Sequence, residues 1–442
     1  MADKEIVARI RHEALWFEGG RAGLSPLLEQ MAGARVVLIG EATHGTDEFY
    51  RTRAELTAAL IQHYGFNLVG VEADWPDAYR ANRWVRHASA DADAAAALAD
   101  FTRFPRWMWR NEAVVDFLSW LRAYNAGVEA EEPRVGFYGL DLYSLHASMD
   151  AVLRYLAKVD PEAARRARQR YACFEEFGDP QGYGYAATVG LSASCEDEVV
   201  QQLTELRRRA GEYASRDGHV AEDEYFFAEQ NARLVRNAEQ YYRSMFGGRS
   251  ESWNLRDSHM METLQALIHW TGRRTRAPKA VVWAHNSHLG DARATQMATY
   301  GELNLGQLVR QEYGDASFLV GFTTHDGTVT AARDWDEPAE RRQVRPSLPG
   351  SYERLFHDTG LSRFVLAIRD SAVREALEVT RLERAIGVVY KPETERASHY
   401  FRANLARQFD AVIHVDRTTA LTPLEPWSVS EADLPETWPT GV

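Results

Sequence analysis

The 442-residue chain carries a formal net charge of −13 and is 45% hydrophobic, so it contains enough apolar sequence to bury a large core. Acidic residues are spread along the chain, which disfavours a protein that binds nucleic acid or anionic membranes. No stretch approaches the ~20 consecutive apolar residues of a membrane-spanning helix. The two cysteines, Cys173 and Cys195, could pair but do not make a disulfide framework. We therefore expect a protein of the reducing cytoplasm.

Apolar runs and helical periodicity alternate in the first third of the chain. Strands are expected at residues 35–39, 67–71 and 134–138, and helices within residues 4–31 and at 46–64, 77–86 and 112–125. Thr46 can cap the helix that follows the first strand, because a threonine hydroxyl often accepts a hydrogen bond from the first helical turn. A single helix between the first two strands predicts a crossover connection, so these strands should be parallel.

From about residue 145 to residue 270 the pattern is helical almost throughout. Strands are expected again at residues 280–284, 318–323, 364–368, 385–390 and 411–415. This order predicts an α/β fold in which helices flank a mostly parallel central sheet, with a large all-helical insertion. Residues 1–144 and 273–442 are expected to form the two parts of the α/β core, and residues 145–272 the insertion.

Ionisable side chains follow four of the predicted strands, at the point where each strand ends. A single carboxylate in such a place is usually a solvated or capping residue. Ligands of open α/β sheets, however, bind outside the carboxyl ends of the strands, so four such ends on one sheet predict a functional site. The residues concerned are Glu41 and His44, Glu72 and Asp74, Asp141, and His285 and His288.

Spacing within these loops indicates which groups can cooperate. Glu41 and His44 are three residues apart, as are His285 and His288. In a tight turn this spacing lets one group orient another, as when a carboxylate fixes the tautomer of an imidazole and raises its basicity. For His288, a helix-capping or surface position is an equally reasonable interpretation.

Two further features lie near the predicted site. Arg53 falls in the apolar stripe of the helix after the first strand, and a buried guanidinium needs an anionic partner. A structural salt bridge with Glu41 or Glu72 and a direct catalytic role both fit this position. Trp107 and Trp109 belong to an aromatic cluster between the second and third strands, which packs in the core or lines a wide substrate pocket.

The common catalytic signatures are missing from the sequence. It contains no nucleophile elbow, no phosphate-binding loop and no paired-histidine zinc motif. With histidines and carboxylates but no activated serine or cysteine, general-base activation of water is the natural mechanism. The same side chains could instead ligate a divalent metal, and sequence spacing does not separate the two arrangements.

Five segments resemble the erythromycin esterase family, and the resemblance extends from about residue 19 to residue 424. The chain is most similar to the broad bacterial branch of homologues rather than to the branch of resistance enzymes. The segments are residues 40–50 (GEATHGTDEFY), 71–76 (VEADWP), 107–111 (WMWRN), 282–289 (VWAHNSHL) and 391–396 (KPETER).

The resemblance implies an α/β core with a helical insertion and a deep cleft, in which water hydrolyses a cyclic, macrolactone-type ester without an acyl-enzyme. At the matching positions, His44 would be the general base, Glu41 its supporting carboxylate and Arg53 the motif arginine. Glu72, His285 and His288 match the remaining motif positions, and a protonated His285 or His288 would join Arg53 in stabilising the oxyanion.

We expect no cofactor for this reaction and a small-molecule ester as the substrate, in contact with Trp107, Trp109, Asp74 and Asp141; the sequence does not define the oligomeric state. Two alternatives remain open. One is a metal-assisted hydrolase, with Glu41, His44, Glu72, His285 and His288 as ligands. The other is a protein that binds a small metabolite without catalysis.

Overall fold

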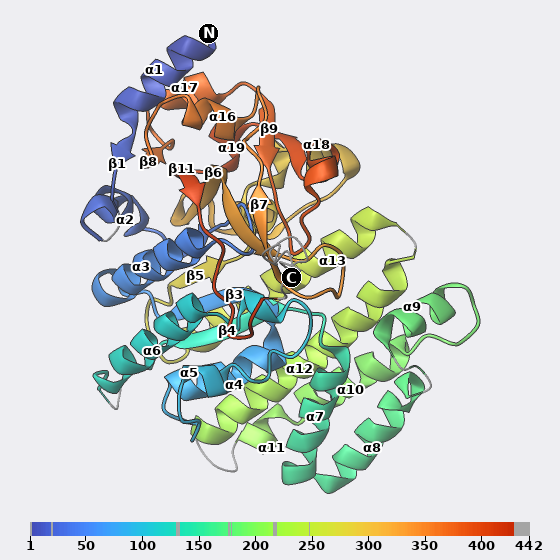
Figure 1. Ribbon diagram of the computed structural model, residues 1–442. Coiled ribbons are helices and arrows are strands. Elements are labelled where there is room, and N and C mark those ends of the chain that lie inside the picture. Colours follow the sequence, from blue (N-terminus) through green and yellow to red (C-terminus); the bar gives the residue numbers. More distant parts are fainter. Residues whose placement is uncertain are drawn as a thin grey trace, which may run out of the picture.

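The computed structural model describes residues 2–18, 21–129, 133–175, 177, 179–214, 219–246 and 248–427. Its centre is a nine-stranded sheet with the order β1-β8-β11-β6-β2-β5-β3-β4, to which β7 adds by pairing with β6, and β9 and β10 form a separate pair (Figure 1). The strands are β1 (Leu15–Trp16), β2 (Val36–Ile39), β3 (Leu68–Asp74), β4 (Gly136–Asp141), β5 (Ala280–Trp283), β6 (Ser317–Ala331), β7 (Glu340–Val344), β8 (Arg363–Ala367), β9 (Arg381–Arg384), β10 (Tyr400–Ala403) and β11 (Ala411–Thr418).

The sheet is mostly parallel, as the sequence predicts. Strands β11, β6, β2, β5, β3 and β4 pair in parallel, whereas β8, β1 and β7 pair antiparallel with their neighbours. The crossover prediction is confirmed in direction, because β2 and β3 are parallel. They are not adjacent, however, since β5 lies between them.

Both faces of the central strands are buried. Val36 and Leu38 of β2 pack into one apolar cluster together with the helical insertion, and Val37 and Ile39 pack into another with the helices of the first third of the chain. This two-sided burial explains the unbroken apolar run of the strand.

Helices cover the two faces of the sheet (Figure 1). Before β4 they are α1 (Asp3–Glu13), α2 (Ser25–Met31), α3 (Asp47–Tyr64), α4 (Trp75–Val85), α5 (Ala94–Ala97) and α6 (Glu112–Ala126). After β5 they are α14 (Asn286–Leu289), α15 (Leu305–Tyr313), α16 (Tyr352–His357), α17 (Val373–Leu377), α18 (Glu395–Ser398) and α19 (Leu405–Gln408).

Between β4 and β5 every described element is a helix. The helices are α7 (Leu145–Val159), α8 (Pro161–Tyr171), α9 (Pro180–Thr188), α10 (Glu196–Arg208), α11 (Ala210–Ala214), α12 (His219–Ser244) and α13 (Arg249–Gly272). They gather at the lower right of Figure 1. None of the helices that the structure describes is long and apolar enough to cross a membrane.

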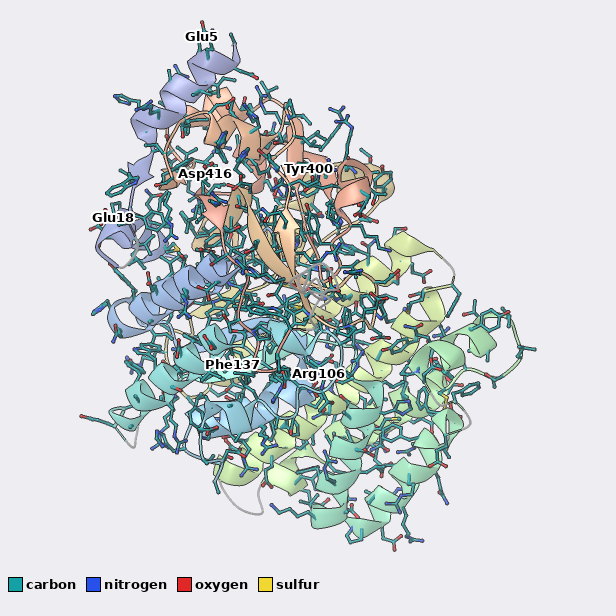
Figure 2. All side chains as sticks on the ribbon, in the orientation of Figure 1. Glu5, Glu18, Arg106, Phe137, Tyr400 and Asp416 are labelled. Atoms are coloured by element: carbon teal, nitrogen blue, oxygen red, sulfur yellow. A yellow bond between two sulfur atoms is a disulfide. The ribbon has the colours of Figure 1, made fainter. Side chains whose placement is uncertain are left out.

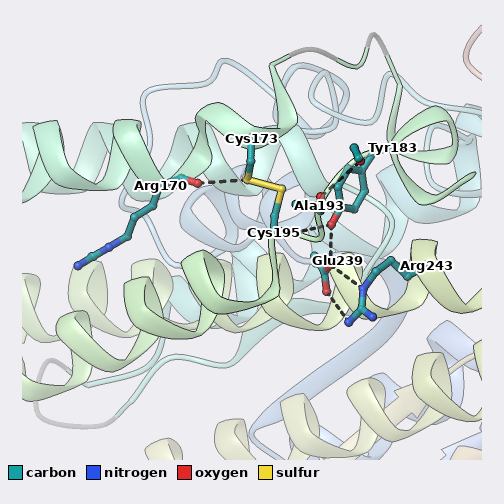
Figure 3. Close-up of a disulfide and its surroundings, with 8 residues drawn as sticks. Arg170, Cys173, Tyr183, Ala193, Cys195, Glu239 and Arg243 are labelled. Carbon is teal, nitrogen blue, oxygen red and sulfur yellow. Dashed lines mark hydrogen bonds and ion pairs between the residues drawn. A yellow bond between two sulfur atoms is a disulfide. The ribbon is translucent and has the colours of Figure 1, made fainter. Parts of the chain in front are cut away.

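A disulfide joins Cys173 and Cys195 within the insertion (Figure 3). Beside it, the Tyr183 hydroxyl donates to Glu239 Oε1 over 2.6 Å and accepts from the backbone N–H of Cys195 over 2.8 Å. Arg243 Nε also donates to Glu239, over 2.7 Å. The two cysteines are therefore paired, and the pair closes a segment of the insertion with a sequence separation of 22 residues.

Two local predictions are wrong. Residues 385–390 do not form a strand. Ile386 makes an isolated bridge to Thr43, whereas Val389 makes one to Ala332, so the segment does not pair continuously with a single strand. Thr46 occupies the N-cap position of α3 without a side-chain cap bond, and its hydroxyl pairs with that of Thr43 instead.

Candidate active site

The carboxyl ends of β2, β5, β3 and β4 meet at one edge of the sheet, where these strands are neighbours in that order. A cavity of about 730 Å³ opens there, within the usual range for small-molecule sites. Seven of the predicted site residues line it: His44, Glu72, Asp74, Trp109, Asp141, His285 and His288.

The turn after β2 is held tightly by its neighbours. A side chain at position 45 would collide with the carbonyl of Thr330, so only glycine fits there. The carbonyl of Glu41 accepts a hydrogen bond from the N–H of Asn286 over 2.8 Å, and that of Ala42 accepts one from Ile386 over 2.9 Å. These contacts fix the backbone that carries Glu41 and His44.

Glu41 links a histidine at the cavity to an arginine behind it. Its Oε1 lies 2.8 Å from Nδ1 of His44, and its Oε2 lies 2.8 Å from Nη2 of Arg53. Arg53 is fully buried and does not line the cavity. Its guanidinium lies over the rings of Tyr50 and Trp283, 4.3 and 5.1 Å from their centroids. Of the two interpretations of Arg53, this geometry favours the salt bridge with Glu41.

The geometry also determines how His44 is protonated. A carboxylate can only accept a hydrogen bond, so the imidazole proton lies on Nδ1. The other nitrogen, Nε2, is then a free base in a side chain that lines the cavity.

His285 lies beside His44, with ring centroids 4.9 Å apart. Its Nδ1 accepts a hydrogen bond from the N–H of Ser287 over 3.2 Å, so a neutral ring carries its proton on Nε2. That nitrogen is buried and has no partner among the described residues. Burial, followed by the nearby His44, lowers the pKa of His285 to about 3. The ring is therefore neutral near pH 7 and presents a single N–H.

His288 is held between two carboxylates. Its Nδ1 lies 2.9 Å from Oδ2 of Asp257, and its Nε2 lies 3.4 Å from Oε1 of Glu72. The ring stacks on Trp253 with centroids 4.5 Å apart. Burial lowers the pKa of His288 and Arg256 opposes its charge, but Asp257 and Glu72 outweigh both, so the pKa is raised.

Glu72 connects the sheet edge to the insertion. Its Oε2 accepts from the backbone N–H of His285 over 2.8 Å, and its Oε1 accepts from Nη2 of Arg256 over 2.7 Å. Burial alone would raise the pKa of Glu72, but His288, Arg256 and His44 lower it well below its usual value. Glu72 is thus a carboxylate that fixes the backbone of His285 and lies close to Nε2 of His288.

The structure adds Arg256 and Asp257, which the sequence analysis missed. Both lie on α13, and Arg256 Nη2 also donates to Asp141 Oδ2 over 2.6 Å. Arg256 lines the cavity, whereas Asp257 is fully buried behind His288. The sequence of α13 contained one signal for these residues, because its charged residues are interspersed with apolar ones and it has no single polar face. That pattern indicates buried ion pairs without naming their partners.

Two further carboxyl groups form another wall of the cavity. Asp74 accepts from Nη1 of Arg103 over 2.8 Å, and Asp77 lies in the first turn of α4. Burial raises the pKa of Asp74 to about 6, with Arg103 opposing and Asp141 adding to the shift. Burial and then Asp74 raise the pKa of Asp77 to about 8. At neutral pH the pair formed by Asp74 and Asp77 therefore retains a proton.

The two predicted tryptophans lie in different places. Trp109 lines the cavity and packs 6.2 Å from the rings of both Phe101 and Phe137. Trp107 is buried in the apolar core and does not line the cavity. The lining also extends far from the sheet edge, since Arg106 and Tyr400 both belong to it and lie well apart in Figure 2.

The carboxylates of the predicted metal-ligand set contact arginines in this structure. Among the described residues, no group of three or more histidine, cysteine, aspartate or glutamate side chains is placed to hold one. Both carboxylates of the predicted ligand set are already engaged by cations, Glu41 by Arg53 and Glu72 by Arg256. A metal at these oxygens would have to displace both ion pairs.

Comparisons with known proteins show what the chain is similar to. The family model described as erythromycin esterase matches residues 61–418. The erythromycin esterase type II of Escherichia coli is 21% identical over 440 residues, covering 94% of this chain and 96% of that protein.

Two solved structures share the fold. The crystal structure of a succinoglycan biosynthesis protein has a TM-score of 0.74 at 20% identity, covering 95% of this chain and 98% of that one. A mutant of the erythromycin esterase EreC in its open conformation has a TM-score of 0.64 at 16% identity, covering 90% and 94%.

Proposed function

Because the chain belongs to the erythromycin esterase family, we propose that it is an ester hydrolase in which His44 activates a water molecule, without a covalent acyl-enzyme. One observation carries this proposal. Nδ1 of His44 is bound to Glu41 over 2.8 Å, so Nε2 is left as the free base of a side chain that lines the cavity.

The proposed reaction uses two imidazoles with opposite tautomers. Nε2 of His44 takes a proton from water, and the hydroxide oxygen attacks the ester carbonyl carbon. Nε2–H of His285 donates a hydrogen bond to the carbonyl oxygen as it becomes negative. A neutral donor in a buried site stabilises such an oxyanion without having to be charged beforehand.

Collapse of the intermediate breaks the bond between the carbonyl carbon and the alcohol oxygen. The proton held by His44 passes to that oxygen, so the products are a carboxylic acid and an alcohol and the enzyme is restored. Arg53, by holding Glu41, keeps His44 in its tautomer and is a positioning residue. The sequence-based expectation is that a protonated His285 or His288 stabilises the oxyanion. In the present proposal a neutral His285 takes this role, because its pKa is about 3.

A bulky ester of the macrolactone type is the first substrate class to test. The cavity is large enough for one, and aromatic side chains such as Trp109 and Trp253 line it together with charged groups. A relative of nearly the same length bears the name erythromycin esterase. We propose a role in inactivating macrolides or related ester metabolites.

A hydrolysis screen tests the proposal. Macrolides with 14- and 16-membered rings and simpler esters are incubated with the wild-type protein, with His44→Ala and with His63→Ala, an exposed histidine on α3. We expect turnover of at least one ester, a fall of about 10²- to 10⁴-fold in kcat for His44→Ala, and no change for His63→Ala or after chelation.

Three outcomes would contradict the proposal. A folded His44→Ala variant with wild-type turnover would exclude His44 as the base. Loss of activity on chelation, restored by a divalent metal, would favour the metal-assisted mechanism. Tight binding of esters without turnover would favour a non-catalytic binding protein.

A further inference from the structure

A second cavity of about 740 Å³ lies in the helical insertion and shares no lining residue with the candidate active site. We call it the insertion groove. Its apolar part includes Phe226 and Trp270, which stack with ring centroids 4.6 Å apart. Its charged part contains four arginines from α10, α12 and the end of α13: Arg207, Arg233, Arg236 and Arg273.

Two of these arginines are neutralised within the groove. Arg207 Nε donates to Oε1 of Glu229 over 2.9 Å, and Arg236 Nη2 donates to Oε2 of Glu262 over 3.2 Å. Glu229 and Glu262 are the carboxylates that line the groove, and His269 and Tyr225 are its other titratable side chains besides the arginines. Two guanidinium groups therefore remain in excess.

The two excess guanidiniums belong to Arg233 and Arg273. Nη1 of Arg233 donates to the backbone carbonyl of Glu262 over 3.0 Å, and the guanidinium of Arg273 lies 4.8 Å from the ring centroid of Trp270. Neither has a carboxylate partner in the part of the chain that the structure describes. The groove therefore presents two cationic side chains without carboxylate partners in the described ranges, in a chain whose net charge is −13.

Two observations indicate that the groove is suited to an anionic ligand that also donates a hydrogen bond. Burial, followed by the charge of Arg207, lowers the pKa of Arg233, which means that the free groove is unfavourable for its cation. The side chain of Gln230, which lines the groove, is 3% exposed, and its Oε1 has no hydrogen-bond donor among the described residues.

We propose that the insertion groove binds a small molecule that carries a phosphate group. Guanidinium groups bind phosphate oxygens through forked, charge-assisted hydrogen bonds, and a dianion is attracted more strongly than a monoanion. A hydroxyl on the same molecule would supply the donor that Gln230 lacks, and Phe226 and Trp270, which line the groove, would contact its apolar part. The groove is separate from the candidate active site, so this proposal does not depend on the proposed hydrolysis.

Titration calorimetry on the full chain tests the proposal, with sodium pyrophosphate, inorganic phosphate and citrate as probes at equal ionic strength. The test variant is Arg233→Gln with Arg273→Gln. The matched control is Arg208→Gln, because Arg208 is exposed on α10 and does not line the groove. Both proteins are first shown to unfold at the wild-type temperature.

We expect pyrophosphate to bind the wild-type protein and the control with equal affinity. Its affinity for the double variant should be lower by a factor of about ten or more, because charge-assisted hydrogen bonds are lost. Arg233→Lys alone should retain part of the affinity, because it keeps the charge but not the fork. The proposal is overturned if neither phosphate probe binds at millimolar concentration, if the double variant binds as tightly as the control, or if citrate binds as tightly as pyrophosphate.

Discussion

The two sides of the candidate active site are assembled in different ways. On the sheet side, Glu41 and His44 share one turn, and Arg53 on the next helix supports them. On the insertion side, Arg256 and Asp257 come from α13 and contact residues far away in the sequence, such as Glu72, 184 positions from Arg256. The sheet side supplies the proposed base and donor, whereas the insertion supplies Arg256 and Asp257, which bind Glu72, Asp141 and His288. The two sides should therefore respond differently to substitution.

The largest effect is expected on the sheet side, from Glu41→Gln. His44 would lose the acceptor that fixes its tautomer, so kcat should fall about 10²-fold or more. Arg53 would remain buried without its counter-charge, which should lower the free energy of unfolding by about 3 kcal/mol. Steady-state kinetics and denaturant unfolding measure the two losses. The exposed Glu29→Gln is the control, and wild-type kinetics for Glu41→Gln would remove Glu41 from the proposed pair.

In the insertion, the disulfide should affect stability but not catalysis. Replacing both Cys173 and Cys195 by serine should lower the free energy of unfolding by about 3 kcal/mol, as expected for a cross-link that closes a loop of this length. The value of kcat/KM should not change, because neither residue lines the cavity. Reductant should destabilise the wild-type protein and leave the variant unaffected. An equal response of both proteins would show that the disulfide does not contribute.

Where the insertion meets the sheet, Asp257→Asn should have an intermediate effect. The loss of a charged acceptor at Nδ1 of His288 should cost about 2 kcal/mol of stability. The raised pKa of His288 stabilises the fold below the unfolded-state value of about 6.5, and this contribution is lost as pH rises through the folded-state pKa. The variant should therefore lose less stability with rising pH than the wild type. Asp358→Asn, which alters an exposed pair with Arg354, should behave like the wild type.

At pH 7 the smallest effect is expected from the ionisation of His285, because this histidine changes stability only at lower pH. Its folded-state pKa of about 3 lies below the unfolded-state value, so the unfolded chain binds the extra proton and stability falls as pH drops from about 6.5 towards 3. His285→Asn should reduce this slope by about 1.4 kcal/mol per pH unit between pH 4 and 6. Unfolding curves at several pH values measure the slope, with the exposed His12→Asn as control. An unchanged slope would show that His285 titrates normally.

Local patterns predicted the sheet side of the site well. The apolar run of β2 ends in a turn bounded by glycines. Because ligands of open α/β sheets bind outside the carboxyl ends of the strands, the sequence placed His44, Glu72, Asp141 and His285 at one edge of the sheet. The cavity does gather these side chains. These predictions succeeded because each depends only on a strand and the loop that follows it.

Long-range pairing could not be read from the same patterns. The position of β5 between β2 and β3 depends on contacts more than 200 residues apart, and periodicity carries no information about such neighbours. Residues 385–390 are apolar enough to suggest a strand, yet they bridge two different segments. Arg256 and Asp257 were missed for the same reason, since a charged residue in a helix gives no indication of its partner.

The central claim is that His44 and His285 hold opposite neutral tautomers, one a base and the other a donor. Nitrogen-15 NMR of histidine-labelled protein at pH 7, assigned with His44→Asn and His285→Asn, measures this directly. The account predicts that His44 is protonated on Nδ1 in its neutral form, and that His285 is neutral with its proton on Nε2. A charged His285, or one with its proton on Nδ1, would contradict the account.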